Sequence, residues 1–207
     1  MSKSVELVFD FVSPNAYLVW WPLNEICERC DAELVVTPVF LAGMHRITGN
    51  APPMIRDKDV RGKNEYAQLE MDRFIAKHGL TQYRLHPQFP FNSITLERML
   101  VAACEDGRGT DFAEALLRPI WEEGIDVTDP QALGQAIAAA GFDPQALLAR
   151  AQDEAVKAKL AANTDDMVER GAFGIPTMFV PAGAARDAMF FGKERLDQVE
   201  EALASET

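Results

Sequence analysis

A short apolar run that stops at a Ser-Pro pair constrains the fold of this chain more than any other feature. The run from Val5 to Phe11 has the length and apolar content of a mostly buried strand. Ser13-Pro14 then suits the cap and the first position of a helix, and an apolar segment continues from Ala16 to Cys30. A Val-rich stretch from Glu33 to Phe40 follows as a second strand. The sequence therefore predicts a parallel strand-helix-strand unit.

The rest of the chain divides into a long helical block and a C-terminal strand-strand-helix segment. Glycines and prolines punctuate residues 61–170 into several short helices. Residues 175–180 and 188–191 are predicted strands, and Arg195 to Ala204 is a predicted amphipathic helix. These elements predict an α/β fold with one small mixed sheet, into which the helical block is inserted. With 207 residues and 48% apolar content, the chain can bury one sizeable core.

Charge and hydropathy exclude several kinds of partner. A net charge of -12 repels nucleic acid and anionic lipid, so we expect neither as a partner. No stretch approaches the roughly 18 apolar residues of a membrane span, and the N-terminus lacks a secretory signal, so we expect a cytoplasmic protein with no membrane partner. Residues 51–100 are net basic, with eight Lys/Arg against six Asp/Glu. This segment is either a solvated helix face of mixed charge or a wall that receives an anion.

Cys27 and Cys30 form an apparent C-x-x-C pair, which invites a redox interpretation. Reactive pairs of this kind lie at a helix N-terminus, where the dipole stabilises a thiolate, whereas these two lie at the predicted C-terminal end. A structural pair is therefore favoured. The remaining thiol and the three histidines are scattered without metal-ligand spacing, so no metal site is predicted.

Ser13 occupies the position that a reactive cysteine would take. One interpretation is an ordinary helix cap, since serine begins many helices in this way. The alternative is a ligand site, because a hydroxyl beside a helix N-terminus at the carboxyl end of a strand is suited to an anion such as a thiolate. The spacing alone leaves both open.

The segment from Gly171 to Thr177 precedes an apolar strand and contains Ile175-Pro176. A proline at a strand start with glycines before it is a candidate cis peptide bond, or else an ordinary loop-to-strand proline. A cis turn there can leave the N–H and C=O of Ile175 free to pair with an extended peptide.

Six motifs in order along nearly the whole chain resemble the bacterial 2-hydroxychromene-2-carboxylate isomerases, which are related to kappa-class glutathione transferases and have a DsbA-like thioredoxin fold. They are F-D-F-x-S-P-x-A-Y-L (9–18), L-A-G with G-N-A-P-P (41–53), F-P-F-N-S (89–93), W-E-E-G-I-D-V-T-D-P (121–130), G-A-F-G-I-P-T (171–177) and F-G-K-E-R-L (191–196). The resemblance implies a thioredoxin-like domain from residues 1–42 and 171–207 and a helical insertion from 43–170. It also implies a homodimer.

The resemblance further implies glutathione as cofactor. Ser13 then faces the glutathione sulfur, and Asn50 lies near the sulfur and the substrate. The backbone of Ile175, beside Pro176, pairs with the cysteinyl unit, and Lys193-Glu194 meets the glutamyl end. Where the family has Trp-Gly-x-Asp-Arg, this chain has Phe-Gly-Lys-Glu-Arg, which moves the carboxylate by a methylene and leaves open a weaker affinity for glutathione or a preference for another thiol.

For the substrate, the resemblance implies a small aromatic carboxylate, a hydroxychromene carboxylate or its ring-opened benzylidene pyruvate. Lys63 with Tyr66 best fits the family's spacing for substrate binding, and Asn92 closes the pocket. Other candidate cations for the carboxylate are Arg46, Arg56 and Arg61. The family usually has Pro-Ala-Lys where this chain has Arg-Gly-Lys at 61–63, so the substrate identity stays open.

Three functions remain: the isomerase, a kappa-type glutathione transferase or peroxidase, and a thiol–disulfide oxidoreductase or non-catalytic thioredoxin-like binding protein. Serine at position 13 and alanine at 16 disfavour disulfide exchange, because serine cannot form a mixed disulfide.

Overall fold

The computed structural model describes residues 3–183 and 186–205. Along the chain its elements are β1 (Lys3–Phe9), α1 (Pro14–Cys30), β2 (Ala32–Pro38), α2 (Leu41–Thr48), α3 (Pro53–Arg56), α4 (Lys63–His78), α5 (Ile94–Glu105), α6 (Gly109–Arg118), the π-helix η1 (Pro119–Glu123), α7 (Pro130–Ala139), α8 (Pro144–Arg150), α9 (Glu154–Glu169), β3 (Thr177–Val180), β4 (Ala188–Phe191), the 3-10 helix η2 (Lys193–Arg195) and α10 (Leu196–Ser205).

The strands form one mixed sheet in the order β2-β1-β3-β4. β1 runs parallel to β2, and β3 is antiparallel to both β1 and β4, with Val8 opposite Thr177. This arrangement confirms the predicted α/β fold. Because the central strand β1 pairs with a strand from the far end of the sequence, the two ends of the chain build one sheet.

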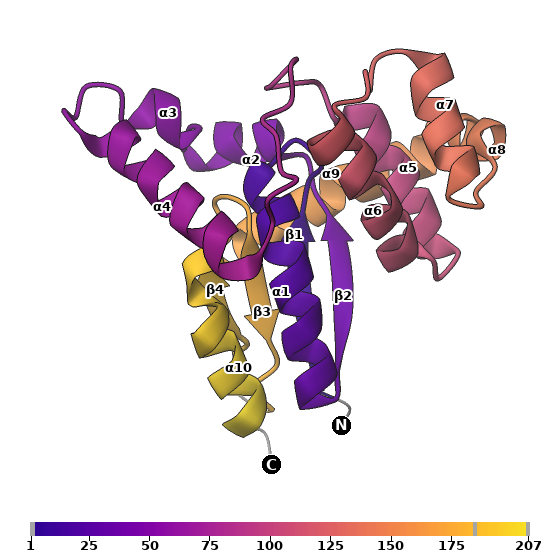
Figure 1. The fold of residues 1–207 in the computed structure, drawn as a ribbon. Coiled ribbons are helices and arrows are strands. Elements are labelled where there is room, and N and C mark those ends of the chain that lie inside the picture. The colour runs from indigo at the N-terminus through magenta and orange to yellow at the C-terminus, as the bar shows by residue number, and fades with distance from the viewer. Residues whose placement is uncertain (1–2, 184–185, 206–207) are drawn as a thin grey trace.

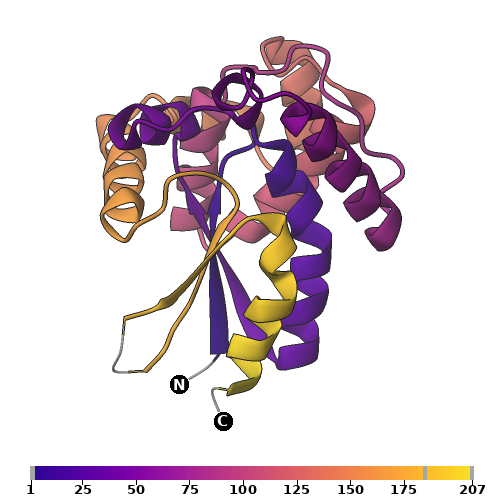
Figure 2. The same ribbon diagram turned by 90° about the vertical axis from the view of Figure 1, so that its left-hand side faces the viewer.

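Helices lie on both sides of the sheet and also over one of its ends. Helices α1 and α10 lie side by side over one face of the sheet (Figure 1). The turned view places α9 on the opposite side of the sheet from α1 and α10 (Figure 2). Helices α2 to α4 arch over the end where β1 meets the N-terminus of α1 (Figure 1). The β1–α1 turn is thus the meeting point of the sheet and the helices that interrupt it.

An aromatic cluster fixes that turn. Phe11 is fully buried, with its ring centroid 4.9 Å from that of Phe9 and 6.2 Å from that of Phe112 on α6. The indole Nε1–H of Trp121 donates to the carbonyl oxygen of Phe11 at 3.1 Å. Buried aromatic side chains of this size contribute several kcal/mol each to stability, so the turn is held firmly by the helical part of the chain.

The element boundaries differ from the sequence prediction at several strands and in one helical region. β2 ends at Pro38 and not at Phe40, and β3 starts at Thr177 and not at Ile175. β1 ends at Phe9 and not at Phe11, since the carboxylate of Asp10 accepts the N–H of Val12 at 3.0 Å and turns the chain. Helices α2 and α3 lie in residues for which the sequence had suggested no helix; α3 is a single turn that starts at Pro53.

Candidate active site

Ser13 is the N-cap residue of α1, but its side chain does not cap the helix. The residue is 4% exposed, and its Oγ has no hydrogen-bond partner among the residues that the structure describes. The backbone is occupied instead: the N–H donates to the carbonyl oxygen of Asp10, and the carbonyl accepts the N–H of Ala16, both at 3.0 Å. The hydroxyl is therefore free for a ligand, which removes the simple capping interpretation.

The first turn of α1 adds an unpaired amide beside that hydroxyl. Pro14 has no N–H, and the N–H of Asn15 makes no hydrogen bond within residues 3–183 and 186–205. The side-chain Oδ1 of Asn15 is also buried without a partner in this part of the chain. A hydroxyl and an amide N–H at the positive end of a 17-residue helix suit an anion, and a thiolate in particular.

The Ile175-Pro176 peptide bond is cis, as the sequence suggested. Its loop is anchored on both sides, because Thr177 Oγ1 donates to the carbonyl of Gly174 at 2.8 Å and Gly192 N–H donates to that of Pro176 at 3.0 Å. Within the described residues, the N–H and C=O of Ile175 make no hydrogen bond. They are a donor and an acceptor of the kind that pairs with an extended peptide.

The strand register brings this loop to Ser13. Val8 on β1 is opposite Thr177 on β3. Since β3 starts at Thr177 and β1 ends one residue after Val8, the Ile175-Pro176 loop enters the sheet at the end where the chain leaves β1 for the turn that carries Ser13. The free hydroxyl and the free backbone of Ile175 therefore line the same end of the sheet.

Asn50 joins this group from the end of α2. Its Nδ2 donates to the carbonyl of Phe173 at 2.7 Å, and its Oδ1 accepts the N–H of Ala51 at 2.8 Å. A Cβ on Gly174 would lie 3.0 Å from the ring of Phe191 and 3.7 Å from Asn50 Nδ2, so glycine is needed for this close approach. The residue pattern alone did not select Asn50; the resemblance did.

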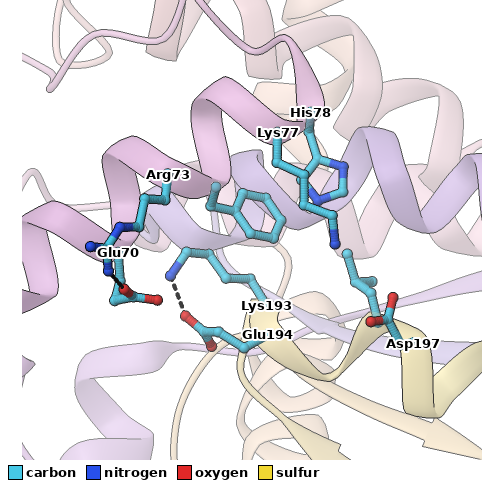
Figure 3. Close-up of a pocket in the computed structure, with 9 residues that line it drawn as sticks. Glu70, Arg73, Lys77, His78, Lys193, Glu194 and Asp197 are labelled. Carbon is cyan, nitrogen blue, oxygen red and sulfur yellow. Dashed lines mark hydrogen bonds and ion pairs between the residues drawn. The ribbon is translucent and has the colours of Figure 1, made fainter.

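Lys193 and Glu194 lie next to the same loop, since Gly192 is bonded to Pro176. Lys193 is 7% exposed; its Nζ pairs with Glu194 and lies 5.5 Å from the centroid of the Phe74 ring. Together with α4 they line a pocket of about 220 Å³ that contains charges of both signs (Figure 3). The other lining residues are Glu70, Arg73, Lys77, His78, Leu196 and Asp197. Such a pocket suits a zwitterion such as an amino acid end.

Two of the predicted substrate residues, Lys63 and Asn92, have no hydrogen bond or ion pair to this group within the described parts of the chain. The side chain of Tyr66 interacts with Glu70 and Arg73, which line the pocket beside Lys193. Lys63 Nζ lies 2.9 Å from Asp57 Oδ1, and Arg56 Nη2 lies 2.8 Å from Asp57 Oδ2, so these two cations share one anion and keep the pKa of Asp57 well below its usual value. Tyr66 is 57% exposed. Asn92 Oδ1 accepts the N–H of Ile94 at 3.1 Å at the start of α5. Their role in substrate binding stays a prediction.

Sequence reasoning missed one side chain beneath Ser13. Glu97 on α5 is fully buried, and its Oε1 accepts the N–H of Phe11 at 2.9 Å. The local signal is a single acidic residue in an otherwise apolar helix face. Its partner is 86 positions away in the sequence, so only the tertiary structure could reveal the contact.

The cysteine pair is located as the sequence indicated, at the C-terminal end of α1. In the described structure Cys27 and Cys30 are free thiols, and burial raises the pKa of Cys27 to about 11. A thiol with such a pKa is almost entirely protonated at neutral pH, so it is a poor nucleophile.

Comparisons with known proteins find one matching family model and relatives of two related kinds. The model of the DSBA-like thioredoxin domain matches residues 4–204. A 2-hydroxychromene-2-carboxylate isomerase of Sphingobium xenophagum is 28% identical, over 98% of this chain and 99% of its own. An isomerase of the same name from Pseudomonas putida is 25% identical, over 96% of this chain and 93% of its own. Human glutathione S-transferase kappa 1 is also 25% identical, over 95% of this chain and 89% of its own.

Solved structures agree on the fold. A 2-hydroxychromene-2-carboxylate isomerase has a TM-score of 0.78 at 23% identity, covering 98% of this chain and 95% of its own. A cytosolic disulfide reductase of Pseudomonas aeruginosa has a TM-score of 0.59 at 17% identity, covering 98% of this chain and 96% of its own. The overall arrangement of the first is more similar to this chain than that of the second, as the higher score indicates.

Proposed function

Because this chain belongs to the family of DSBA-like thioredoxin domains, and its relatives are isomerases and glutathione transferases, we propose that it is a glutathione-dependent isomerase. The reaction we propose converts 2-hydroxychromene-2-carboxylate, or a close analogue, to trans-o-hydroxybenzylidenepyruvate in bacterial catabolism of aromatic compounds. The observation that carries this proposal is the free hydroxyl of Ser13 at the N-terminus of α1, near the unpaired backbone of Ile175.

The chain's own groups fit glutathione. The unpaired N–H and C=O of Ile175 match the extended backbone of the cysteinyl unit, and the mixed charges of Lys193 and Glu194 match the amine and carboxylate of the glutamyl end. We assign the sulfur of such a peptide to Ser13 and the N–H of Asn15, because both are unpaired within the described residues at the N-terminus of α1. The sulfur, the cysteinyl backbone and the glutamyl end of the peptide thus each have a candidate partner that the described structure leaves free or holds in a charged pocket.

Ser13 donates its hydroxyl hydrogen to the sulfur, and the N-terminus of α1 adds a positive potential, so together they hold the thiol in its deprotonated form. When bound, glutathione supplies a thiolate that adds reversibly to the conjugated carbon and makes the former double bond rotatable. Asn50, held by Phe173, orients the substrate beside the sulfur. Burial of Ser13 excludes water that would otherwise compete for the sulfur.

The carboxylate of the substrate needs a cation from the basic segment. Arg56 makes two contacts with Asp57 and can neutralise it alone, so Lys63 can turn to a substrate carboxylate without leaving Asp57 unpaired. Arg46 and Arg61 have no ion pair among the residues described and are the alternatives. Tyr66 and Asn92 complete the proposed substrate residues.

A kappa-type glutathione transferase or peroxidase is the second candidate. Human glutathione S-transferase kappa 1 is as similar in identity as the P. putida isomerase, and the same thiol-activating group would serve conjugation. Disulfide exchange at this site is not proposed, because the cysteine positions are filled by Ser13 and Ala16.

We also propose a cytoplasmic homodimer. No helix within residues 3–183 and 186–205 is long and apolar enough to cross a membrane. Large apolar side chains are exposed along α2, α3 and α4, where a second copy would cover them; they are Ile47, Met54, Ile55 and Leu69. Sedimentation of the purified protein at twice the monomer mass supports the dimer, and sedimentation as a monomer refutes it.

One experiment tests the main proposal. Purified protein is added to 2-hydroxychromene-2-carboxylate with and without glutathione, the absorbance of the benzylidene pyruvate is followed, and the assay is repeated with Ser13→Ala. We expect glutathione-dependent isomerisation that falls strongly in the mutant. Equal rates in the two proteins would refute the role of Ser13, and conjugation of a test electrophile without isomerisation would favour the transferase.

A further inference from the structure

Two carboxyl groups lie directly beneath the turn that carries Ser13. Asp10 follows β1, and Glu97 lies on α5; both are 0% exposed. Neither forms an ion pair with a Lys, Arg or His of the described residues. Two adjacent buried carboxylates without a cation are strongly unfavourable, so the pair keeps at least one proton.

The hydrogen bonds show which oxygen is left for that proton. Asp10 accepts the N–H of Val12 on Oδ1 at 3.0 Å and that of Leu41 on Oδ2 at 2.9 Å. Glu97 accepts the N–H of Phe11 on Oε1 at 2.9 Å. Glu97 Oε2 is buried and accepts from no donor in the part of the chain that the structure describes. Three oxygens act as acceptors, and only this fourth one is free to carry a hydrogen.

We propose that Glu97 is a neutral carboxylic acid whose Oε2–H donates to Asp10, and that this shared proton makes Glu97 a positioning residue for Ser13. Through Oε1 the acid holds Phe11 N–H, and through Asp10 it holds Val12 N–H and the start of α2. The Ser13 N–H is fixed on the carbonyl of Asp10 itself. The whole backbone from Asp10 to Ser13 is thus tied to one protonated pair.

The surroundings support this protonation state. Burial and the neighbouring charge of Asp10 raise the pKa of Glu97 well above its usual value, while burial raises the pKa of Asp10 to about 6 against the opposing effect of its hydrogen bonds. The groups that face the pair are the hydroxyl of Ser93, the amides of Leu41, Val12 and Phe11, and the thiol of Cys104. At neutral pH none of them supplies a positive charge that would stabilise a second carboxylate.

Infrared spectroscopy of the whole protein tests the proton directly. At neutral pH we expect wild type to show the carbonyl stretch of a protonated carboxylic acid, which Glu97→Gln lacks. The matched control Glu169→Gln, at an exposed position on α9 without an ion pair in the described structure, should keep the band. No such band in wild type, or its persistence in E97Q, overturns the proposal whether or not the isomerase function holds.

The positioning role rests on the proposed function and is tested by the pH profile of the thiol-dependent reaction. Glutamine keeps an acceptor for Phe11 N–H and a donor for Asp10, so we expect kcat/KM of E97Q within about threefold of wild type at neutral pH. At alkaline pH wild type should lose activity as Glu97 ionises, whereas E97Q should not. Parallel alkaline profiles in the two proteins, alongside the infrared result, would refute the positioning role while leaving the shared proton intact.

Discussion

Replacing Ser13 by alanine should raise the pKa of bound glutathione by the contribution of one buried hydrogen bond to a thiolate. Hydrogen bonds to charged groups contribute about 1.5–3 kcal/mol, which is about one to two pKa units. Since Ser13 is 4% exposed, water cannot replace the missing hydroxyl. The helix N-terminus contributes a further 0.3–1 kcal/mol or so and remains in the mutant. The reference pKa of a thiol is about 8.5, so we expect the thiol of bound glutathione to have a pKa of about 6.5 in wild type and about 8 in Ser13→Ala.

The assay is a titration of the protein saturated with glutathione, followed by the ultraviolet absorbance of the thiolate. Because every site is occupied, a change in the titration reports the pKa of the bound thiol and not a change in the affinity for glutathione. The matched control is Ser205→Ala, whose hydroxyl donates to the carbonyl of Glu201 at the exposed end of α10, and which should titrate as wild type. The expected shift leaves roughly tenfold less thiolate at neutral pH in S13A. Equal thiol pKa values in S13A and wild type would refute the hydroxyl as the activating group.

Three further outcomes are expected. Lys193→Gln should weaken glutathione binding about tenfold, measured by calorimetry, since a buried charged contact is lost; unchanged affinity would remove the α4 pocket from the site. From about pH 5 upward, wild type should lose stability relative to Glu97→Gln in urea unfolding, because the raised pKa of Glu97 makes the native state bind more protons than the unfolded state; a constant difference contradicts this. Replacing Cys27 and Cys30 together by alanine should leave thiol-dependent activity intact, whereas its loss would give the pair a chemical role.

Local patterns predicted most of the scaffold. The first strand, the helix start at Ser13-Pro14 and the apolar helix to Cys30 could be predicted from residue types because each is decided within a few positions. The end of β1 was placed too late, since Phe11 is as apolar as Phe9 and nothing local shows that it packs on Phe112 of α6. Short helices such as α3 carry too little periodicity to be distinguished from a turn.

The residues of the candidate site also divide into those that local patterns predict and those that depend on distant contacts. Ser13 and Ile175 could be proposed from their local turns, and the structure adds that the side chain of one and the backbone of the other are unpaired among the described residues. Asn50 and Glu97 act through contacts with Phe173 and Phe11, which are 123 and 86 positions away. Contacts at such separations depend on tertiary packing, so a single sequence cannot reveal them.

The pairing of β1 with β3 has an evolutionary consequence. The turn proposed to activate the thiol and the loop proposed to bind the peptide belong to adjacent strands, so the sheet holds them next to each other. From the helical part of the chain, Phe112, Trp121 and Glu97 contact the turn itself. The remaining helices can therefore diversify, and with them the choice of electrophile, while the proposed thiol chemistry is kept. A shared thiol site combined with variable helices would produce relatives with different activities, and the relatives of this chain are named as isomerases and as transferases.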